Sequence, residues 1–239
     1  MFYKPFTDDH PLIDRLHAFI AKPDFPCVGA KSAMGKGRIK AVVARAITSS
    51  WNDLAIHAAL LRFTADYKRD RQMFQSLAII FEGPRTLDEA TFEANMWARI
   101  QSLSDKDVWL GQEYDESVSP DPANPHFSLS FGGEAYFVVG LHPRASRKAR
   151  RFVAPTMIFN LHTQFEQLRD AGRYEKLRSS ILDRDVAYSG SLNPMLARHG
   201  EQSEARQYSG RVVDPSWGCP FAYRGEANDS LKDADRDAA

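Results

Sequence analysis

The segment from Phe25 to Lys31 places one of the two cysteines of this 239-residue chain where a reactive or metal-bound thiolate could form. Pro26 stiffens the backbone before Cys27, and Gly29 lets the following backbone fold closely around the sulfur, so that amide N–H groups can point at a negative charge. Lys31 adds a cation nearby. Positive charge and oriented amides favour a thiolate. The alternative is a protonated, packed core thiol.

A basic decapeptide over residues 142–151, HPRASRKARR, follows a predicted strand. Because it leaves the edge of a sheet, its side chains would extend from a rigid backbone. Arg144 and Arg147 could each bind a carboxylate or phosphate through paired, charge-assisted hydrogen bonds. A solvated surface turn is the alternative.

His162 lies at a predicted junction between a strand and a helix, and Asn160 precedes it by two residues. Strand ends are common ligand sites in sheet-based domains, and imidazole is a common iron ligand. A hydrogen-bonded packing role is the alternative for His162, and the same two interpretations apply to His142.

Residues 189–221 lose hydrophobic periodicity but keep aromatic, charged and proline residues. A long ordered loop of this kind is usually functional. Glu201 and Glu204 are candidates to pair with a cationic substrate, and Tyr208 and Arg211 with the edge of a cofactor. Ordinary caps and turns with satisfied side chains are the alternative.

Hydrophobic spacing alternates between helical and strand patterns along the chain. Helices are predicted over 12–20, 51–69, 87–103 and 162–184, the last with a break at Gly172; strands over 39–47, 77–81, 127–131, 135–141 and 156–161. The predicted helix caps are Asp8 or Asp9, Ser50 or Asn52, and Thr86 in a capping box with Glu89. No element is predicted for the small-residue stretch over 30–37.

The element pattern, with a hairpin at Gly132-Gly133, predicts one α+β domain over residues 1–224. Its helices pack around a central, largely antiparallel sheet, and a long ordered loop segment lies near the C-terminus. Residues 225–239 are rich in aspartate, lack aromatic residues and are predicted to form a disordered acidic tail.

Charge and cysteine content limit the possible partners. The 31 basic and 31 acidic residues cancel, which argues against nucleic acid or an anionic membrane as the main partner. No window reaches the 18 or more apolar residues of a membrane span. Two cysteines make no secreted disulfide framework, and no signal-peptide pattern is present, so a reducing cytoplasm is the expected compartment.

A set of ordered motifs over about residues 13–222 resembles the YqcI/YcgG family. The motifs are FPCVGA (25–30), HPRASR (142–147) with ARRF (149–152), FNLH (159–162) with QFE (164–166), SGSLNPML (189–196), EARQYSGR (204–211) and CPF (219–221). The family includes haem-dependent enzymes that N-hydroxylate arginine or a cyclic guanidino amino acid. The resemblance therefore implies haem b, dioxygen or peroxide as oxidant, and a guanidino substrate.

The candidate axial ligands to the haem iron can be ranked on chemical grounds. A thiolate ligand pushes electron density onto iron and favours O–O cleavage, so Cys27 is preferred, ahead of His162, then His142 and Cys219. The chain has no Gly-x-Gly-x-x-Gly nucleotide motif, so an external reductase would supply electrons.

The resemblance also suggests roles for the other candidates. Lys31, Arg144, Arg147 or Arg211 would hold the haem propionates. Gly29 and Tyr208 would complete the cofactor site, while Glu201 or Glu204, with Asn160, would serve the substrate. Two other hypotheses remain: a non-catalytic haem-binding or gas-sensing protein without an acidic substrate pocket, and a cofactor-free module that binds an anion or a partner.

Overall fold

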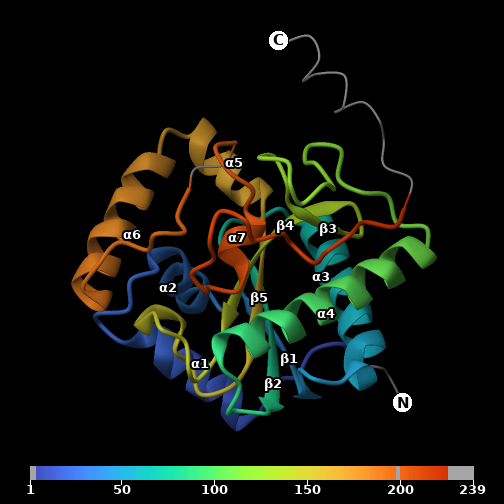
Figure 1. Cartoon of the computed structure of the whole chain (residues 1–239), viewed down its shortest axis with the longest axis horizontal. Helices are drawn as coiled ribbons and strands as arrows, with labels where there is room; N and C mark the ends of the chain where they lie inside the picture. The colour runs from blue at the N-terminus through green and yellow to red at the C-terminus, as the bar shows by residue number, and fades with distance from the viewer. Residues whose placement is uncertain (1–3, 198–199, 226–239) are drawn as a thin grey trace.

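The computed structural model describes residues 4–197 and 200–225 (Figure 1). Apart from Gly225, the predicted acidic tail therefore lies outside the described residues. Seven α-helices and a five-stranded, mostly antiparallel sheet form one α+β domain in this part of the chain, as predicted.

The sheet has the order β1-β2-β5-β4-β3. Its strands are β1 (Ile39–Ala46), β2 (Ser76–Gly83), β3 (Leu129–Phe131), β4 (Glu134–Leu141) and β5 (Thr156–Leu161). Only β1 and β2 are paired in parallel, and the other neighbours are antiparallel. Gly132 and Gly133 join β3 to β4 at φ values of +60° and +73°, the left-handed region that a tight hairpin turn requires. The predicted hairpin is confirmed.

Helices cover both faces of the sheet (Figure 1). They are α1 (Pro11–Ala21), α2 (Val28–Gly35), α3 (Asp53–Arg69), α4 (Glu89–Trp109), α5 (Thr163–Asp170), α6 (Tyr174–Ser189) and the single-turn α7 (Ala205–Tyr208). The predicted break at Gly172 separates α5 from α6. Residues 189–221 are otherwise irregular, as their lack of periodicity indicated.

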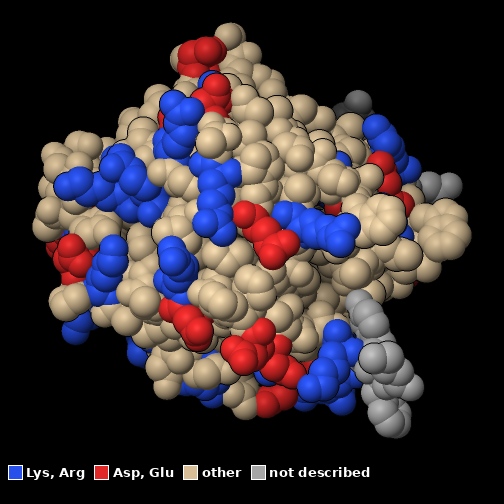
Figure 2. Space-filling view, turned by 90° about the horizontal axis from the view of Figure 1, so that it is seen from below, with Lys and Arg blue, Asp and Glu red and all other residues tan. Residues whose placement is uncertain are grey.

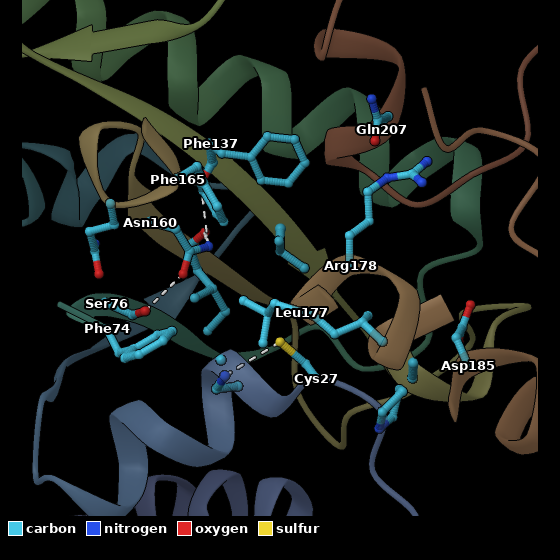
Figure 3. Close-up of a pocket in the computed structure, with 18 of the residues that line it drawn as sticks. Cys27, Phe74, Ser76, Phe137, Asn160, Phe165, Leu177, Arg178, Asp185 and Gln207 are labelled. Carbon is cyan, nitrogen blue, oxygen red and sulfur yellow. Dashed lines mark hydrogen bonds between the residues drawn. The ribbon is translucent and has the colours of Figure 1, made fainter. Parts of the chain in front are cut away.

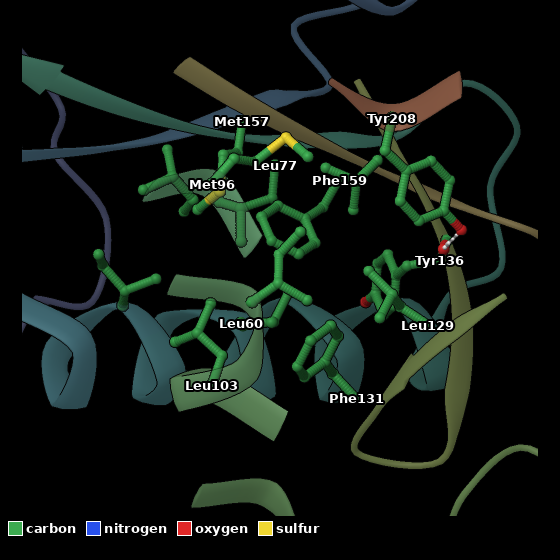
Figure 4. Close-up of a cluster of buried hydrophobic side chains, with 14 of the residues drawn as sticks. Leu60, Leu77, Met96, Leu103, Leu129, Phe131, Tyr136, Met157, Phe159 and Tyr208 are labelled. Atoms are coloured by element: carbon green, nitrogen blue, oxygen red, sulfur yellow. Dashed lines mark hydrogen bonds between the residues drawn. The ribbon is translucent and has the colours of Figure 1, made fainter. Parts of the chain in front are cut away.

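Strand β2 shows how the sheet separates two hydrophobic cores. Leu77, Ile79 and Phe81 point to one face and join the core formed with α3 and α4 (Figure 4). Ala78 and Ile80 point to the other face and join the core formed with α1. Because alternate residues of a strand face opposite sides, a continuous apolar run is needed when both faces are buried.

Three helix starts differ from the predicted ones. His10, not Asp8 or Asp9, caps α1: its ring accepts an N–H of the first turn at 3.1 Å. Asp88, not Thr86, caps α4 in the same way. Helix α4 begins at Glu89, two residues after the predicted start, and its cap moves with it. Helix α1 begins at Pro11, so the residue directly before it, His10, is the cap.

The entry to α3 also differs. A short 3-10 turn, Ser50–Asn52, precedes α3. Neither of the two predicted caps, Ser50 and Asn52, caps α3 with its side chain. The Asn52 side chain instead accepts the backbone N–H of Arg45 from β1 at 3.0 Å. The asparagine therefore ties the turn to the sheet.

Helix α2 was not predicted. It is only eight residues long, and Ala33 is its one buried residue, so hydrophobic periodicity could not reveal it. The helix begins directly after Cys27 and therefore determines where the sulfur points.

Within residues 4–197 and 200–225, no helix combines the length and the apolarity needed to cross a bilayer. Basic and acidic side chains are interspersed over the face shown in Figure 2.

Candidate functional site

A cavity of about 400 Å³ lies between the sheet and the helices α1, α2, α5 and α6 (Figure 3). This volume is in the range typical of small-molecule sites. Its wall is mostly apolar and includes Leu16, Phe19, Ile20, Phe25, Ile39, Phe74, Phe137, Val139, Ile158, Phe165, Leu168, Leu177, Ile181, Leu182 and Leu196. Polar side chains interrupt this wall and could orient a largely apolar ligand.

Cys27 is the N-cap of α2 and lines the cavity. Its Sγ accepts the backbone N–H of Ala30 at 3.4 Å (Figure 3). The first turn of a helix presents free N–H groups and the positive end of the helix dipole, both of which stabilise an anion. The backbone therefore folds around the sulfur as Gly29 led us to expect.

Lys31 does not contribute the cation that we expected at the sulfur. Its Nζ donates to the carbonyl oxygens of Lys22 and Pro23, at 2.6 and 3.0 Å. Burial raises the pKa of the Cys27 thiol, and the amides of Ala30 and Gly29 offset this only in part. The thiol is therefore protonated at neutral pH in the protein alone.

His162 and Glu204 meet at the end of β5. His162 Nε2 lies 3.6 Å from Glu204 Oε1, and both side chains are buried and line the cavity. Ser128 Oγ donates to Glu204 Oε2 at 2.6 Å. The C-terminal segment thus brings a carboxylate, held by a hydroxyl group, into a mostly apolar cavity.

Asn160 lines the same cavity from the middle of the sheet. Its Oδ1 accepts a hydrogen bond of 2.7 Å from Ser76, its register partner on β2 (Figure 3). Its Nδ2 lies 3.4 Å from the carbonyl oxygens of Phe137 and Ile158. These contacts fix the amide flat against the strands.

Two arginines of the basic decapeptide anchor the cavity wall. Arg147 pairs with Asp185 of α6 at 2.5 Å and donates to the Ser191 carbonyl at 2.8 Å. Arg150 is half-buried and donates to three backbone carbonyls, two of them in α7. Burial lowers the pKa of Arg150 to about 10. The decapeptide therefore holds α6 and α7 in place through these two arginines.

The remaining candidates lie away from the cavity lining. Arg144 donates to the Thr86 carbonyl, and Arg211 pairs with Glu93 of α4. Tyr208 is buried in the core beside α4.

Glu201, Cys219 and His142 do not line the cavity either. Glu201 and Cys219 line a separate recess. His142 is buried and stacks on Phe92, with ring centroids 4.4 Å apart. The structure thus brings together Cys27, Gly29, Arg147, Asn160, His162 and Glu204.

Sequence reasoning missed several polar residues of the cavity, among them Arg178 of α6 and Gln207 of α7 (Figure 3). Arg178 lies one turn from Tyr174 and from Ile181, on the face that was predicted to be apolar. A positive charge on a helix face that is otherwise apolar was the signal in the sequence that could have identified Arg178 as a cavity residue. Gln207 had none, because no periodicity marks α7.

The residues of the cavity fit a haem. Among the described residues, no group of three or more His, Cys, Asp or Glu could hold a bare metal ion. A haem iron takes its equatorial ligands from the porphyrin and needs only an axial protein atom, which Cys27 Sγ can provide. The apolar wall suits the macrocycle, and an arginine on the wall suits a propionate.

A sequence model of the YqcI/YcgG family matches residues 16–222 of the chain. The chain is also similar to an uncharacterized protein, YqcI of Bacillus subtilis (strain 168). The two are 25% identical over 207 residues, which cover 82% of this chain and 80% of the relative. No solved structure gives a significant match.

Proposed function

Because the chain belongs to the YqcI/YcgG family, we propose that it is a haem-dependent monooxygenase that N-hydroxylates the guanidine group of arginine or a related guanidino amino acid. One observation carries the proposal: a mostly apolar cavity contains both a cysteine at a helix N-terminus and a buried carboxylate. When bound, haem b would supply the oxidising chemistry from dioxygen or peroxide, with electrons from an external donor.

Cys27 would hold the iron. The thiol loses its proton on binding, and the N–H of Ala30, 3.4 Å from the sulfur, then stabilises the anion. The first turn of α2 also directs its dipole at the sulfur. This setting favours a thiolate once iron replaces the proton, although burial disfavours a free thiolate.

Glu204 would hold the substrate. A guanidinium group in an apolar cavity needs a counter-charge, and a carboxylate binds its paired N–H groups in a fixed geometry. Ser128 holds one oxygen of Glu204, so the plane of the carboxylate is set before substrate arrives. His162, 3.6 Å from the other oxygen, is placed to take up the proton that the guanidinium releases.

The buried carboxylate also favours turnover over sensing. A haem protein that only binds a gas needs no carboxylate in its cavity, whereas a guanidinium substrate pairs well with one. Glu204 is 6% exposed, accepts a hydrogen bond from Ser128 and lines the cavity. A carboxylate held in this position suits a cationic substrate.

Absorption spectra of the purified, haem-supplemented protein test the cofactor and its ligand. We expect a Soret band and, after reduction with carbon monoxide added, the band typical of a thiolate ligand. Cys27→Ser should lose that band, whereas Cys219→Ser, a matched control in the separate recess, should keep it. A ferrous–CO band without thiolate character that is unchanged in Cys27→Ser and lost in His162→Ala would transfer the ligand to the imidazole. A protein with no Soret band would refute the proposal.

Incubation of the haem-loaded protein with arginine, dioxygen and a reductant tests turnover. Mass spectrometry should detect a product with one added oxygen atom. Glu204→Gln keeps the shape and the Ser128 contact but removes the charge, so we expect it to raise the KM for arginine by about tenfold or more. An unchanged KM would exclude Glu204 as the guanidinium partner.

A further inference from the structure

Arg178 and Gln207 have polar groups that face the cavity and have no partner in the part of the chain that the structure describes. Figure 3 shows the Arg178 side chain extending from α6 toward Gln207 of α7, and Cys27 lines the same cavity. Within residues 4–197 and 200–225, no group hydrogen-bonds to the guanidinium of Arg178 or to the carboxamide of Gln207.

Gln207 is 5% exposed, so its carboxamide has little access to bulk water. Buried amides are hydrogen-bonded in nearly all proteins, because leaving one unsatisfied is costly. A buried side chain that points into a cavity without a partner therefore indicates a partner from outside the chain.

The other cations of the cavity wall are already engaged. Arg147 pairs with Asp185, and Arg169 pairs with Glu166. Arg150 is occupied by backbone carbonyls. Of the described arginines on the wall, Arg178 is thus the one whose guanidinium has no hydrogen-bond partner.

We propose that Arg178 and Gln207 bind a carboxylate group of the molecule that fills the cavity, an inference that rests on the proposed function in taking this cavity as the ligand site. The guanidinium presents a planar pair of N–H donors that matches a carboxylate, and the glutamine amide adds a further donor. The apolar wall receives the rest of the ligand. The carboxylate could be a haem propionate or the carboxylate of the amino-acid substrate.

A probe that needs neither haem nor turnover isolates this property. Fluorescence titration of the haem-free chain with 1-pyrenebutyrate and with the uncharged 1-pyrenebutanol measures the preference for a carboxylate on an apolar body. We expect the butyrate to bind about tenfold more tightly or better, as one charge-assisted contact allows. Arg178→Met should remove that preference. Lys176→Met, which removes an exposed cation from the same helix, should retain it.

A second pair of measurements identifies the source of the carboxylate. If it is a propionate, Arg178→Met weakens haem binding about tenfold and leaves the discrimination between arginine and its decarboxylated analogue unchanged. If it belongs to the substrate, haem binding is unchanged and that discrimination is lost. Either result supports the inference.

The carboxylate site and the proposed function can be refuted independently of each other. A pyrene preference that is lost in Arg178→Met supports the carboxylate site even if the protein takes up no haem. If the protein takes up haem and hydroxylates arginine, but its haem-free form shows no preference for the carboxylate probe or keeps that preference in Arg178→Met, the carboxylate site alone is overturned.

Discussion

The thiol of Cys27 must lose its proton before the sulfur can bind ferric iron, so haem uptake should depend on pH. Burial raises the pKa of this thiol above its ordinary value, and the proton therefore stays on the sulfur throughout the neutral range. Below that pKa, each rise of one pH unit increases the thiolate fraction about tenfold, and the affinity for ferric haem should rise with it.

Haem titrations between pH 6 and pH 8 measure this slope. Cys27→Ser, which has no proton to release in this range, should bind haem more weakly and with little dependence on pH. Equal slopes in the two proteins would contradict thiolate ligation by Cys27.

The residues of the site differ in how far the sequence could predict them. Cys27 and its glycine lie in a short local motif, so their geometry could be inferred from neighbours alone. Glu204 and His162 meet only because the C-terminal segment crosses the end of β5, a contact between residues 42 positions apart in the sequence. Residue type indicated their chemistry, but only the tertiary structure pairs them and separates Glu204 from Glu201.

At the scale of elements, α6 is attached to the segment that carries Cys27. Arg184 Nη2 donates to the backbone carbonyls of Pro23 and Phe25, at 2.7 and 3.0 Å. These bonds join the outer wall of the cavity to the residues directly before the cysteine. The position of α6 and that of the sulfur are therefore coupled.

Arg184→Met should loosen this connection. Loss of hydrogen bonds from a charged donor should lower the free energy of unfolding by about 1.5–3 kcal/mol. Urea denaturation measures that loss, and haem transfer to an acceptor apoprotein should become faster. Lys176→Met, on the exposed side of the same helix, serves as the control and should change neither value. Normal haem retention in Arg184→Met would show that α6 does not secure the site.

The elements themselves were predicted with uneven success, for a physical reason. Every strand was predicted, because the two buried faces of the sheet demand apolar runs such as Leu77–Phe81. Helix α2 was missed because small residues pack by backbone contact and leave no apolar stripe. Caps such as His10 depend on where the first turn begins, which a hydrophobic pattern does not specify.

At the scale of the whole molecule, the sheet divides a sealed core from a core that is hollowed by the cavity. The α3 and α4 side is filled by large buried residues, among them Leu60, Phe131 and Phe159 (Figure 4). The α1, α2 and α6 side contains the cavity. One face should therefore determine stability, and the other should determine which ligand binds.

A matched pair of substitutions on neighbouring strands tests this division. Ile79 of β2 faces the sealed core and is fully buried, whereas Ile158 of β5 lines the cavity. Ile79→Val removes one methylene from a close-packed region and should lower the free energy of unfolding by about 0.5–1.5 kcal/mol without changing haem affinity. Ile158→Val should cost less in stability, since its side chain already borders open space, but should weaken haem binding by about fourfold, the value of one buried methylene. Urea denaturation and haem titration of both variants measure the two effects. If Ile79→Val alters haem affinity as much as Ile158→Val does, the sheet does not separate the two roles.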